Sequence, residues 1–153
     1  MLRDKSLIPL SHQHQHALAL CVQIDRALKS GQPDLARLHS EVQRLFRDEI
    51  RYHFESEEKV LFPAAAKAGL GGLVDELLVE HGSLRKYAAK QTLTMAELQI
   101  FAESLSAHIR KEERQLFEKL QELLSAEDMA GLGSALDAYF RGSGMAGASC
   151  ALR

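Results

Sequence analysis

The chain repeats one short polar pattern, in which a histidine precedes a pair of glutamates. HFESEEKVLF begins at His53 and HIRKEERQLF begins at His108, and both read H-x-x-x-E-E-x-x-L-F. Residues four apart on a helix lie on the same face. Each repeat therefore places a histidine beside a carboxylate, His53 with Glu57 and His108 with Glu112. Imidazole and carboxylate groups together are suitable ligands for iron, manganese or zinc.

Histidines also lie on the apolar stripes of two other predicted helices. His81 continues the stripe of one, and His14 continues the stripe of the other. The chain thus contains a lone histidine followed by H-x-x-x-E twice, which is an internal pseudo-repeat. His12 falls on a mostly polar face and His16 on an intermediate one. His14 is therefore the predicted ligand of the first helix, with His12 and His16 as alternatives.

Six polar groups on apolar stripes need partners, because each buried polar group without one costs on the order of 1–3 kcal/mol. Hydrogen-bonded core histidines or buried ion pairs are the ordinary explanation, but buried ion pairs rarely offset their desolvation. Four nitrogens and two carboxylates also exceed the needs of one tetrahedral zinc ion. We therefore predict a two-metal centre with the ligands His14, His53, Glu57, His81, His108 and Glu112.

The elements that must position these residues are all helical. Apolar residues at helical spacing predict four long helices and a short fifth, with no strand-like alternation. A capping box of Thr94 and Glu97 begins the fourth, and Pro63 either kinks the second or stops it early. Short loops favour an all-α, up-down-up-down four-helix bundle. The predicted ranges are 11–29, 34–67, 72–90, 94–124 and 126–141.

Length and composition fit one domain, residues 1–141, followed by a flexible Gly/Ser-rich tail, residues 142–153. The net charge of −2 gives no reason to expect nucleic-acid binding. No apolar run is long enough to span a membrane, and the start of the chain lacks the apolar segment of a signal peptide. Cys21 and Cys150 form no metal or disulfide spacing pattern, so we expect a cytoplasmic, reducing location.

Four segments together resemble the hemerythrin-like, or HHE cation-binding, family over about residues 10–124: LSHQHQHALAL, HFESEEKVLFP, LVEHGSLR and HIRKEERQLFEKL. The resemblance implies a four-helix bundle around two iron ions bridged by an oxo or hydroxo group, with zinc or manganese as alternatives. It implies that Glu57 and Glu112 bridge the two ions. It also implies four terminal ligands, which are His14, His53, His81 and His108.

The sequence departs from the oxygen-carrying hemerythrins at two places. Carriers have a second histidine four residues after the third-helix ligand, and here that position is Arg85, which cannot bind a metal. Carriers also place their last carboxylate five residues after its histidine, whereas here both Glu112 and Glu113 are available. One metal is therefore expected to have fewer nitrogens, with Glu58, Glu113 or water filling the gap.

The expected function is binding or sensing of dioxygen, a related small oxidant, or iron itself. An alternative is an enzyme with peroxidase- or oxidase-like activity, because the missing nitrogen at Arg85 leaves more exchangeable coordination positions. A second alternative is a structural or regulatory bundle that binds another divalent metal, or none. The expected partner is a small molecule such as O₂. The fifth helix either packs on the end of the bundle or forms a homodimer.

Overall fold

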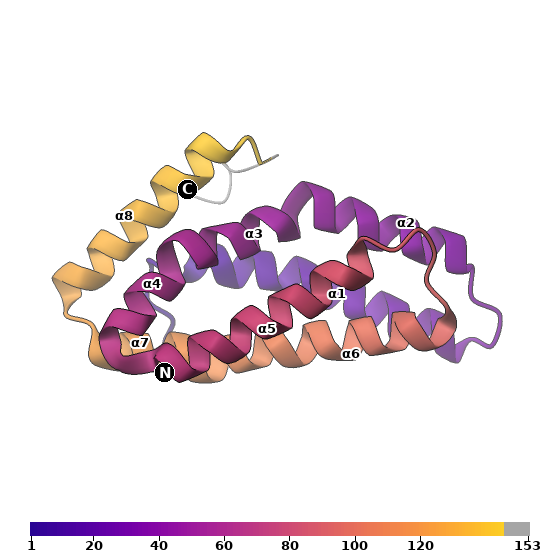
Figure 1. The fold of residues 1–153 in the computed structure, drawn as a ribbon, viewed down its shortest axis with the longest axis horizontal. Coiled ribbons are helices and arrows are strands. Elements are labelled where there is room, and N and C mark those ends of the chain that lie inside the picture. Colours follow the sequence, from indigo (N-terminus) through magenta and orange to yellow (C-terminus); the bar gives the residue numbers. More distant parts are fainter. Residues whose placement is uncertain (146–153) are drawn as a thin grey trace.

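The computed structural model describes residues 1–145, which form an all-α protein with four long helical runs and a shorter fifth helix (Figure 1). The first run is α1 (Ile8–Lys29) and the third is α5 (Gly71–Ala88). The second run consists of α2 (Leu35–Leu45), η1 (Phe46–Ile50), α3 (Arg51–Ser56), η2 (Glu57–Leu61), α4 (Phe62–Ala65) and η3 (Ala66–Leu70). The fourth consists of α6 (Met95–Lys111), η4 (Glu112–Phe117) and α7 (Glu118–Leu123), and α8 (Ala126–Ser143) follows it. None of the described helices is both long and apolar enough to cross a membrane.

Side-chain caps fix where the later helices begin. The hydroxyl of Thr94 accepts a hydrogen bond from the N–H of Glu97, whose carboxylate accepts one from the N–H of Thr94. This is the predicted capping box, and it starts α6. The hydroxyl of Ser125 accepts from the N–H of Asp128 and starts α8 in the same way. Gly69, with a φ of 99°, provides the break before α5.

The second run is longer than predicted and passes through Pro63. Proline cannot donate the usual helical hydrogen bond, and its ring crowds the preceding turn. The π-helical segment η2 ends at Leu61, so a widened turn ends two residues before the proline. At the other end of the chain, α8 continues past residue 141 to Ser143, and Gly144 ends it in the left-handed conformation. Of the predicted tail, residues 146–153, including Cys150, lie outside the described residues.

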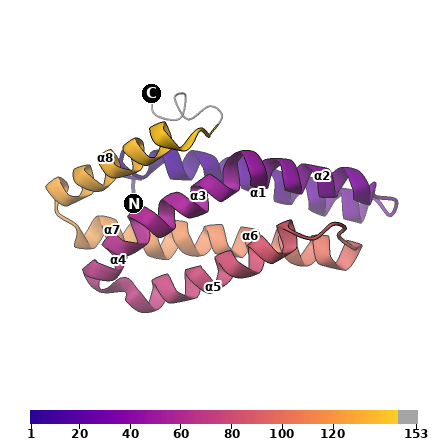
Figure 2. The same cartoon turned by 45° about the horizontal axis from the view of Figure 1, so that its top comes forward.

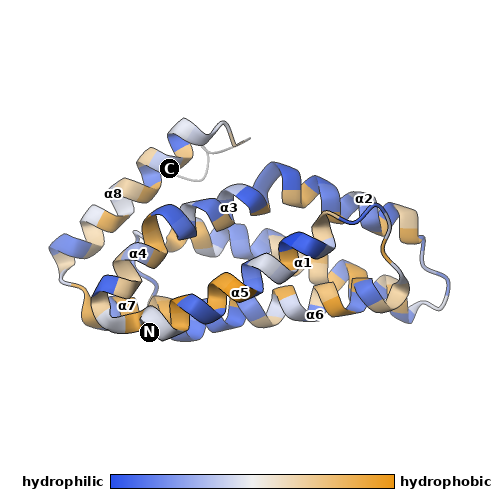
Figure 3. Ribbon diagram, viewed as in Figure 1, coloured by the Kyte–Doolittle hydropathy of each residue, from blue (hydrophilic) through white to orange (hydrophobic). Residues whose placement is uncertain are grey.

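The four long runs pack around two apolar clusters, and the amphipathic pattern is visible along the helices (Figure 3). Each run contributes to both clusters. The first cluster contains Leu10, Leu61, Leu77 and Leu116, and the second contains Ala17, Ile50, Leu84 and Leu105. On every run, the predicted ligands lie between these two positions. The polar residues therefore form a layer between two apolar cores, and those cores hold the helices that carry them.

Helix α8 lies outside the bundle, beside the end that contains α4 and α7 (Figures 1 and 2). It packs against α3 and η2 of the same chain. Its buried residues join the first apolar cluster, and they are Met129, Leu132, Leu136 and Phe140. The fifth helix thus covers the end of its own bundle, which is one of the two arrangements expected from the sequence.

The contact between α8 and the N-terminal segment predicts a stability effect. A Cβ atom at Gly133 would lie 2.5 Å from Oγ and 2.7 Å from Cβ of Ser6. We expect Gly133→Ala to lower the free energy of unfolding by about 1–3 kcal/mol, because overpacking displaces that segment. Gly131→Ala is the matched control: its Cβ would meet nothing within 4 Å, so it should stabilise α8 by up to about 1 kcal/mol. Urea denaturation measures both, and equal effects would contradict the close contact.

Candidate metal centre

All six predicted ligands lie in the buried layer between the two apolar clusters. Their side chains come from all four helical runs, and none of the six residues is more than 5% exposed: His14, His53, Glu57, His81, His108 and Glu112. His12 and His16 are exposed, and His16 pairs with Glu49 at 2.5 Å. The structure thus directs His14, rather than its two neighbours, into the interior. The assignment of the six side chains as metal ligands stays a prediction.

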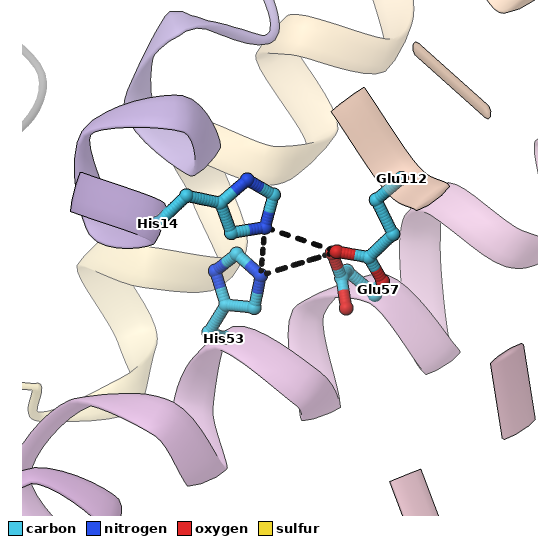
Figure 4. A group of neighbouring side chains, drawn as sticks. All are labelled: His14, His53, Glu57 and Glu112. Atoms are coloured by element: carbon cyan, nitrogen blue, oxygen red, sulfur yellow. Dashed lines mark hydrogen bonds and ion pairs between the residues drawn. The ribbon is translucent and has the colours of Figure 1, made fainter. Parts of the chain in front are cut away.

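One half of the layer brings His14 and His53 against two carboxylates (Figure 4). Nε2 of His14 lies 3.0 Å from Nε2 of His53 and 3.0 Å from Oε2 of Glu112. Nε2 of His53 lies 3.0 Å from Oε1 of Glu57. If one ligand atom is taken from each of the four residues, all four atoms lie within 4.8 Å of one another. This first group has the size of a single metal site.

The other half brings His81 and His108 against the same two carboxylates. Nε2 of His81 lies 3.1 Å from Oε2 of Glu57, and Nε2 of His108 lies 2.8 Å from Oε1 of Glu112. Each carboxylate therefore turns one oxygen toward each pair of histidines. Both groups contain two imidazoles and share Glu57 and Glu112, which is the arrangement of two metal sites joined by two carboxylates.

Unpartnered polar atoms provide the test of whether this layer fits a cation. Among the described residues, five buried atoms that face the interior of the layer have no hydrogen-bond partner. They lie close to one another, yet their geometry is not that of hydrogen bonds, and buried polar groups without partners are rare. A cation would accept electron pairs from all of them. The five are both carboxylate oxygens of Glu57, Oε1 of Glu112, and Nε2 of His81 and His108.

The outer nitrogens of two rings are held by the second glutamate of each repeat. Nδ1 of His14 lies 2.7 Å from Oε1 of Glu113, and Nδ1 of His81 lies 2.8 Å from Oε1 of Glu58. An ionised carboxylate only accepts hydrogen bonds, so Nδ1 of each ring is the donor to it and Nε2 is the nitrogen that faces the interior. The sequence left Glu58, Glu113 or water to fill a vacant metal position. The structure instead places the two glutamates on the outer side of the rings, where such partners orient metal-binding histidines.

The other two rings have outer partners that the sequence did not reveal. Nδ1 of His53 donates to Oε1 of Gln13 at 2.7 Å. Nδ1 of His108 lies 3.7 Å from Oε2 of Glu80, which is beyond hydrogen-bond distance. Gln13 and Glu80 lie on different helices from the rings they face. Only the packing of the bundle brings them there, and no spacing in the sequence could have identified them.

A positively charged side chain pairs with each of the three carboxylates on the outer side of the rings. Arg85 binds Glu58 and lies over the ring of Phe54, with 5.5 Å between the guanidinium carbon and the ring centre. Arg85 therefore joins neither ligand group, and it secures the glutamate that holds His81. The three ion pairs are Arg3 with Glu113 at 2.6 Å, Arg85 with Glu58 at 2.6 Å, and Lys111 with Glu80 at 3.0 Å.

The charges of the layer favour protons or a metal on the rings. Burial opposes protonation of His53 and His108, but the carboxylates of Glu57 and Glu112 outweigh it and raise the pKa of both rings to about 10. Burial also opposes ionisation of the two glutamates, yet the neighbouring histidines lower the pKa of each. The carboxylates therefore stay ionised, and a metal ion has to displace protons from the rings when it binds.

Backbone geometry is unusual at the two shared carboxylates. The π-helical segment η2 begins at Glu57, and η4 begins at Glu112. Such widened turns are rare and occur frequently at functional sites. Each widened turn begins at the glutamate that ends the H-x-x-x-E segment and contains both glutamates of its repeat. The adjacent glutamates in each repeat are the only sequence signal at these positions, and helical spacing does not predict the widening.

A small pocket opens beside both histidines of the first group and beside His108 of the second. It is lined by Gln13, His14, His53, Glu49 and His108, together with apolar walls from Ala17, Leu45, Ile50, Phe54, Leu105 and Ile109. The centre of a water-sized molecule has about 10 Å³ in which to move, which is enough space for one such molecule. The pocket therefore restricts any ligand at the histidine face of the layer to a few atoms.

The partner of His81 predicts a change in metal affinity. In Glu58→Ala, Nδ1 of His81 loses its acceptor and Arg85 loses its ion pair. We expect the affinity for a divalent metal to fall roughly 10- to 100-fold, which is the usual effect of removing such a partner. Competition with a coloured chelator measures it. Glu55→Ala, on the outer side of the same run, is the control, and equal affinities in the two variants would refute the role of Glu58.

Comparison with known proteins adds one finding. The family model described as the hemerythrin HHE cation binding domain matches residues 9–120. The matched range contains all six ligand candidates, the two shared carboxylates among them. No curated protein and no solved structure matches the chain.

Proposed function

Because this chain belongs to the hemerythrin HHE cation-binding domain family, we propose that it binds two iron ions between its four helical runs and uses them to bind or sense dioxygen or a related small oxidant. His14 and His53 would hold one ion, and His81 and His108 the other. Bound iron would supply a redox-active centre with room for one further small ligand.

The observation that carries this proposal is the sharing of two carboxylates by two pairs of histidines. Glu57 directs Oε1 to His53 and Oε2 to His81, at 3.0 and 3.1 Å. Glu112 directs Oε2 to His14 and Oε1 to His108, at 3.0 and 2.8 Å. A single ion would leave one of the two histidine pairs without a partner in the buried layer. Two ions use every candidate atom.

The donor set supports iron and an open coordination position. Each group offers two imidazoles and two carboxylates, and two histidines with carboxylate are typical ligands of non-haem Fe(II). Four protein ligands leave positions free on an ion that accepts six. The neighbouring pocket has apolar walls of Ala17, Ile50 and Leu105, which suit a small apolar molecule such as O₂. The residues themselves orient the metal, exclude bulk water and limit the size of the ligand.

Anaerobic loading with Fe(II), followed by exposure to air, tests the proposal. We expect two irons per chain, and we expect Mössbauer spectra of two magnetically coupled ferric ions. Metal analysis of protein purified without added metal should accompany this test, because it shows which ion the site selects. Fewer than two irons per chain, or two uncoupled ions, would refute the two-iron centre.

An enzyme is the second candidate, and the position of Arg85 favours it. Arg85 pairs with Glu58 outside the ligand groups, so the third helical run supplies only His81. Fewer nitrogen ligands leave more exchangeable positions, which suits turnover of peroxide or another oxidant. Steady-state consumption of hydrogen peroxide by the iron-loaded protein distinguishes the two candidates. Iron-loaded protein that binds small ligands without turnover would exclude the enzyme.

A further inference from the structure

The amide of Gln13 is an unexplained polar group in the interior. Gln13 is only 6% exposed. Its Oε1 accepts the hydrogen bond from Nδ1 of His53 at 2.7 Å, but its Nε2 is buried without any partner. Since buried donors nearly always find acceptors, a molecule that is absent from the protein itself is the natural partner of this amide.

Glutamine at position 13 differs from the residues that face the other histidines of the layer. The other three histidines face carboxylates, namely Glu113, Glu58 and Glu80. A carboxylate would accept the hydrogen bond of His53 equally well, because that bond requires only an acceptor. Glutamine adds two N–H donors that His53 does not use. These donors are what distinguishes Gln13 from the outer partners of the other rings.

The position of Gln13 shows where the donors are available. Gln13 lines the small pocket together with His14, His53 and His108. The remaining walls are apolar apart from Glu49, whose carboxylate pairs with His16. Within the lining of this pocket, Gln13 therefore offers an uncharged hydrogen-bond donor, next to the first group, that no protein group uses.

We propose that the side-chain amide of Gln13 donates a hydrogen bond to a ligand of two or three atoms in this pocket, while its oxygen holds His53. The inference rests on the proposed function and deepens it. It places the ligand beside Gln13 and His53, and it selects ligands whose outer atom accepts a hydrogen bond. Azide, a small anion that accepts hydrogen bonds, is a suitable probe.

Two substitutions separate the donor of Gln13 from its acceptor. Gln13→Glu keeps an acceptor for His53 but loses the donor and adds a charge. Gln13→Leu loses both groups and adds no charge. Gln15→Leu is the matched control, because Gln15 lies on the same helix and is exposed. Each protein is loaded with iron, its iron content is measured, and azide is titrated to obtain a dissociation constant.

We expect wild-type protein and Gln15→Leu to bind azide equally. Both Gln13 variants should bind it roughly 10- to 100-fold more weakly, the effect of losing a hydrogen bond to a charged group, and Gln13→Glu should retain its iron. In zinc-loaded wild-type protein, the side-chain N–H signals of Gln13 should shift when azide is added. This NMR measurement does not depend on iron chemistry.

Other outcomes would overturn the inference. Weaker binding in Gln13→Leu alone means that Gln13 acts only through His53, and weaker binding in Gln13→Glu alone means that charge is responsible. Loss of iron from both variants also assigns Gln13 a purely structural role. If both variants bind azide as wild type does, only this inference fails. If iron-loaded wild-type protein binds no azide, the proposed ligand-binding function itself fails.

Discussion

Glu112→Gln is expected to abolish binding of both metal ions while leaving the protein folded. One oxygen of Glu112 faces His14, at 3.0 Å, and the other faces His108, at 2.8 Å. The carboxylate therefore belongs to both ligand groups, and an amide supplies neither its charge nor its second electron-pair donor. Iron per chain, measured after anaerobic loading and removal of free metal, should fall from two to nearly none.

Two further variants show whether the loss of iron is specific to the shared carboxylate. Glu122→Gln makes the same chemical change at an exposed position of α7, and it should bind as much iron as wild type. His14→Leu removes a ligand from one group only, so it should lose one ion and keep the other. Circular dichroism confirms that each variant is helical. A Glu112→Gln variant that still binds two irons would contradict the bridging role of Glu112.

Removal of the metal is expected to lower thermal stability strongly. A ligand that binds only the folded state at 1,000 times its dissociation constant stabilises it by about 4 kcal/mol. For a domain of this size, that corresponds to roughly 8–16 °C in Tm for each ion. The reason is structural: without metal, the layer contains buried atoms of Glu57 and His81 that lack partners. Calorimetry with and without a strong chelator measures the shift.

The Glu112→Gln variant is the control for this second experiment. Because it should hold no metal, its Tm should be the same with and without chelator. A general effect of the chelator on the protein would instead lower both midpoints equally. If the midpoint of metal-loaded wild-type protein does not change on chelation, the ions contribute nothing to the folded state, and the account of the buried layer is wrong.

The helical architecture could be predicted from the sequence because helical periodicity fixes which residues share a face. That periodicity places His53 with Glu57 and His108 with Glu112, and it separates His14 from His12. The predicted bundle and the family are confirmed. Burial of all six candidate side chains in one layer then follows from the alternation of apolar and polar positions along each run.

The surroundings of the rings could not be predicted, because they depend on contacts between helices. Gln13 reaches His53 across 40 positions of the chain, and Glu58 reaches His81 across 23. The π-helical turns at Glu57 and Glu112 also change the direction of the following residues, so an ideal helix cannot say whether the second glutamate of each repeat faces inward. In the structure, these second glutamates hold the outer nitrogens of two histidines.

The outer contacts make His53 different from the other three rings. The rings of His14, His81 and His108 face carboxylates that are paired with Arg3, Arg85 and Lys111, whereas His53 faces the neutral amide of Gln13. A ring that donates to a carboxylate is the more basic ligand. We therefore expect the half with His53, which also adjoins the pocket, to be the more open to an added ligand.

Anomalous X-ray diffraction at the iron absorption edge, from crystals of the iron-loaded protein, tests the central claim most directly. We expect two iron peaks per chain, one between His14 and His53 and one between His81 and His108, with Glu57 and Glu112 contacting both. A single peak, or peaks away from these four histidines, would contradict it.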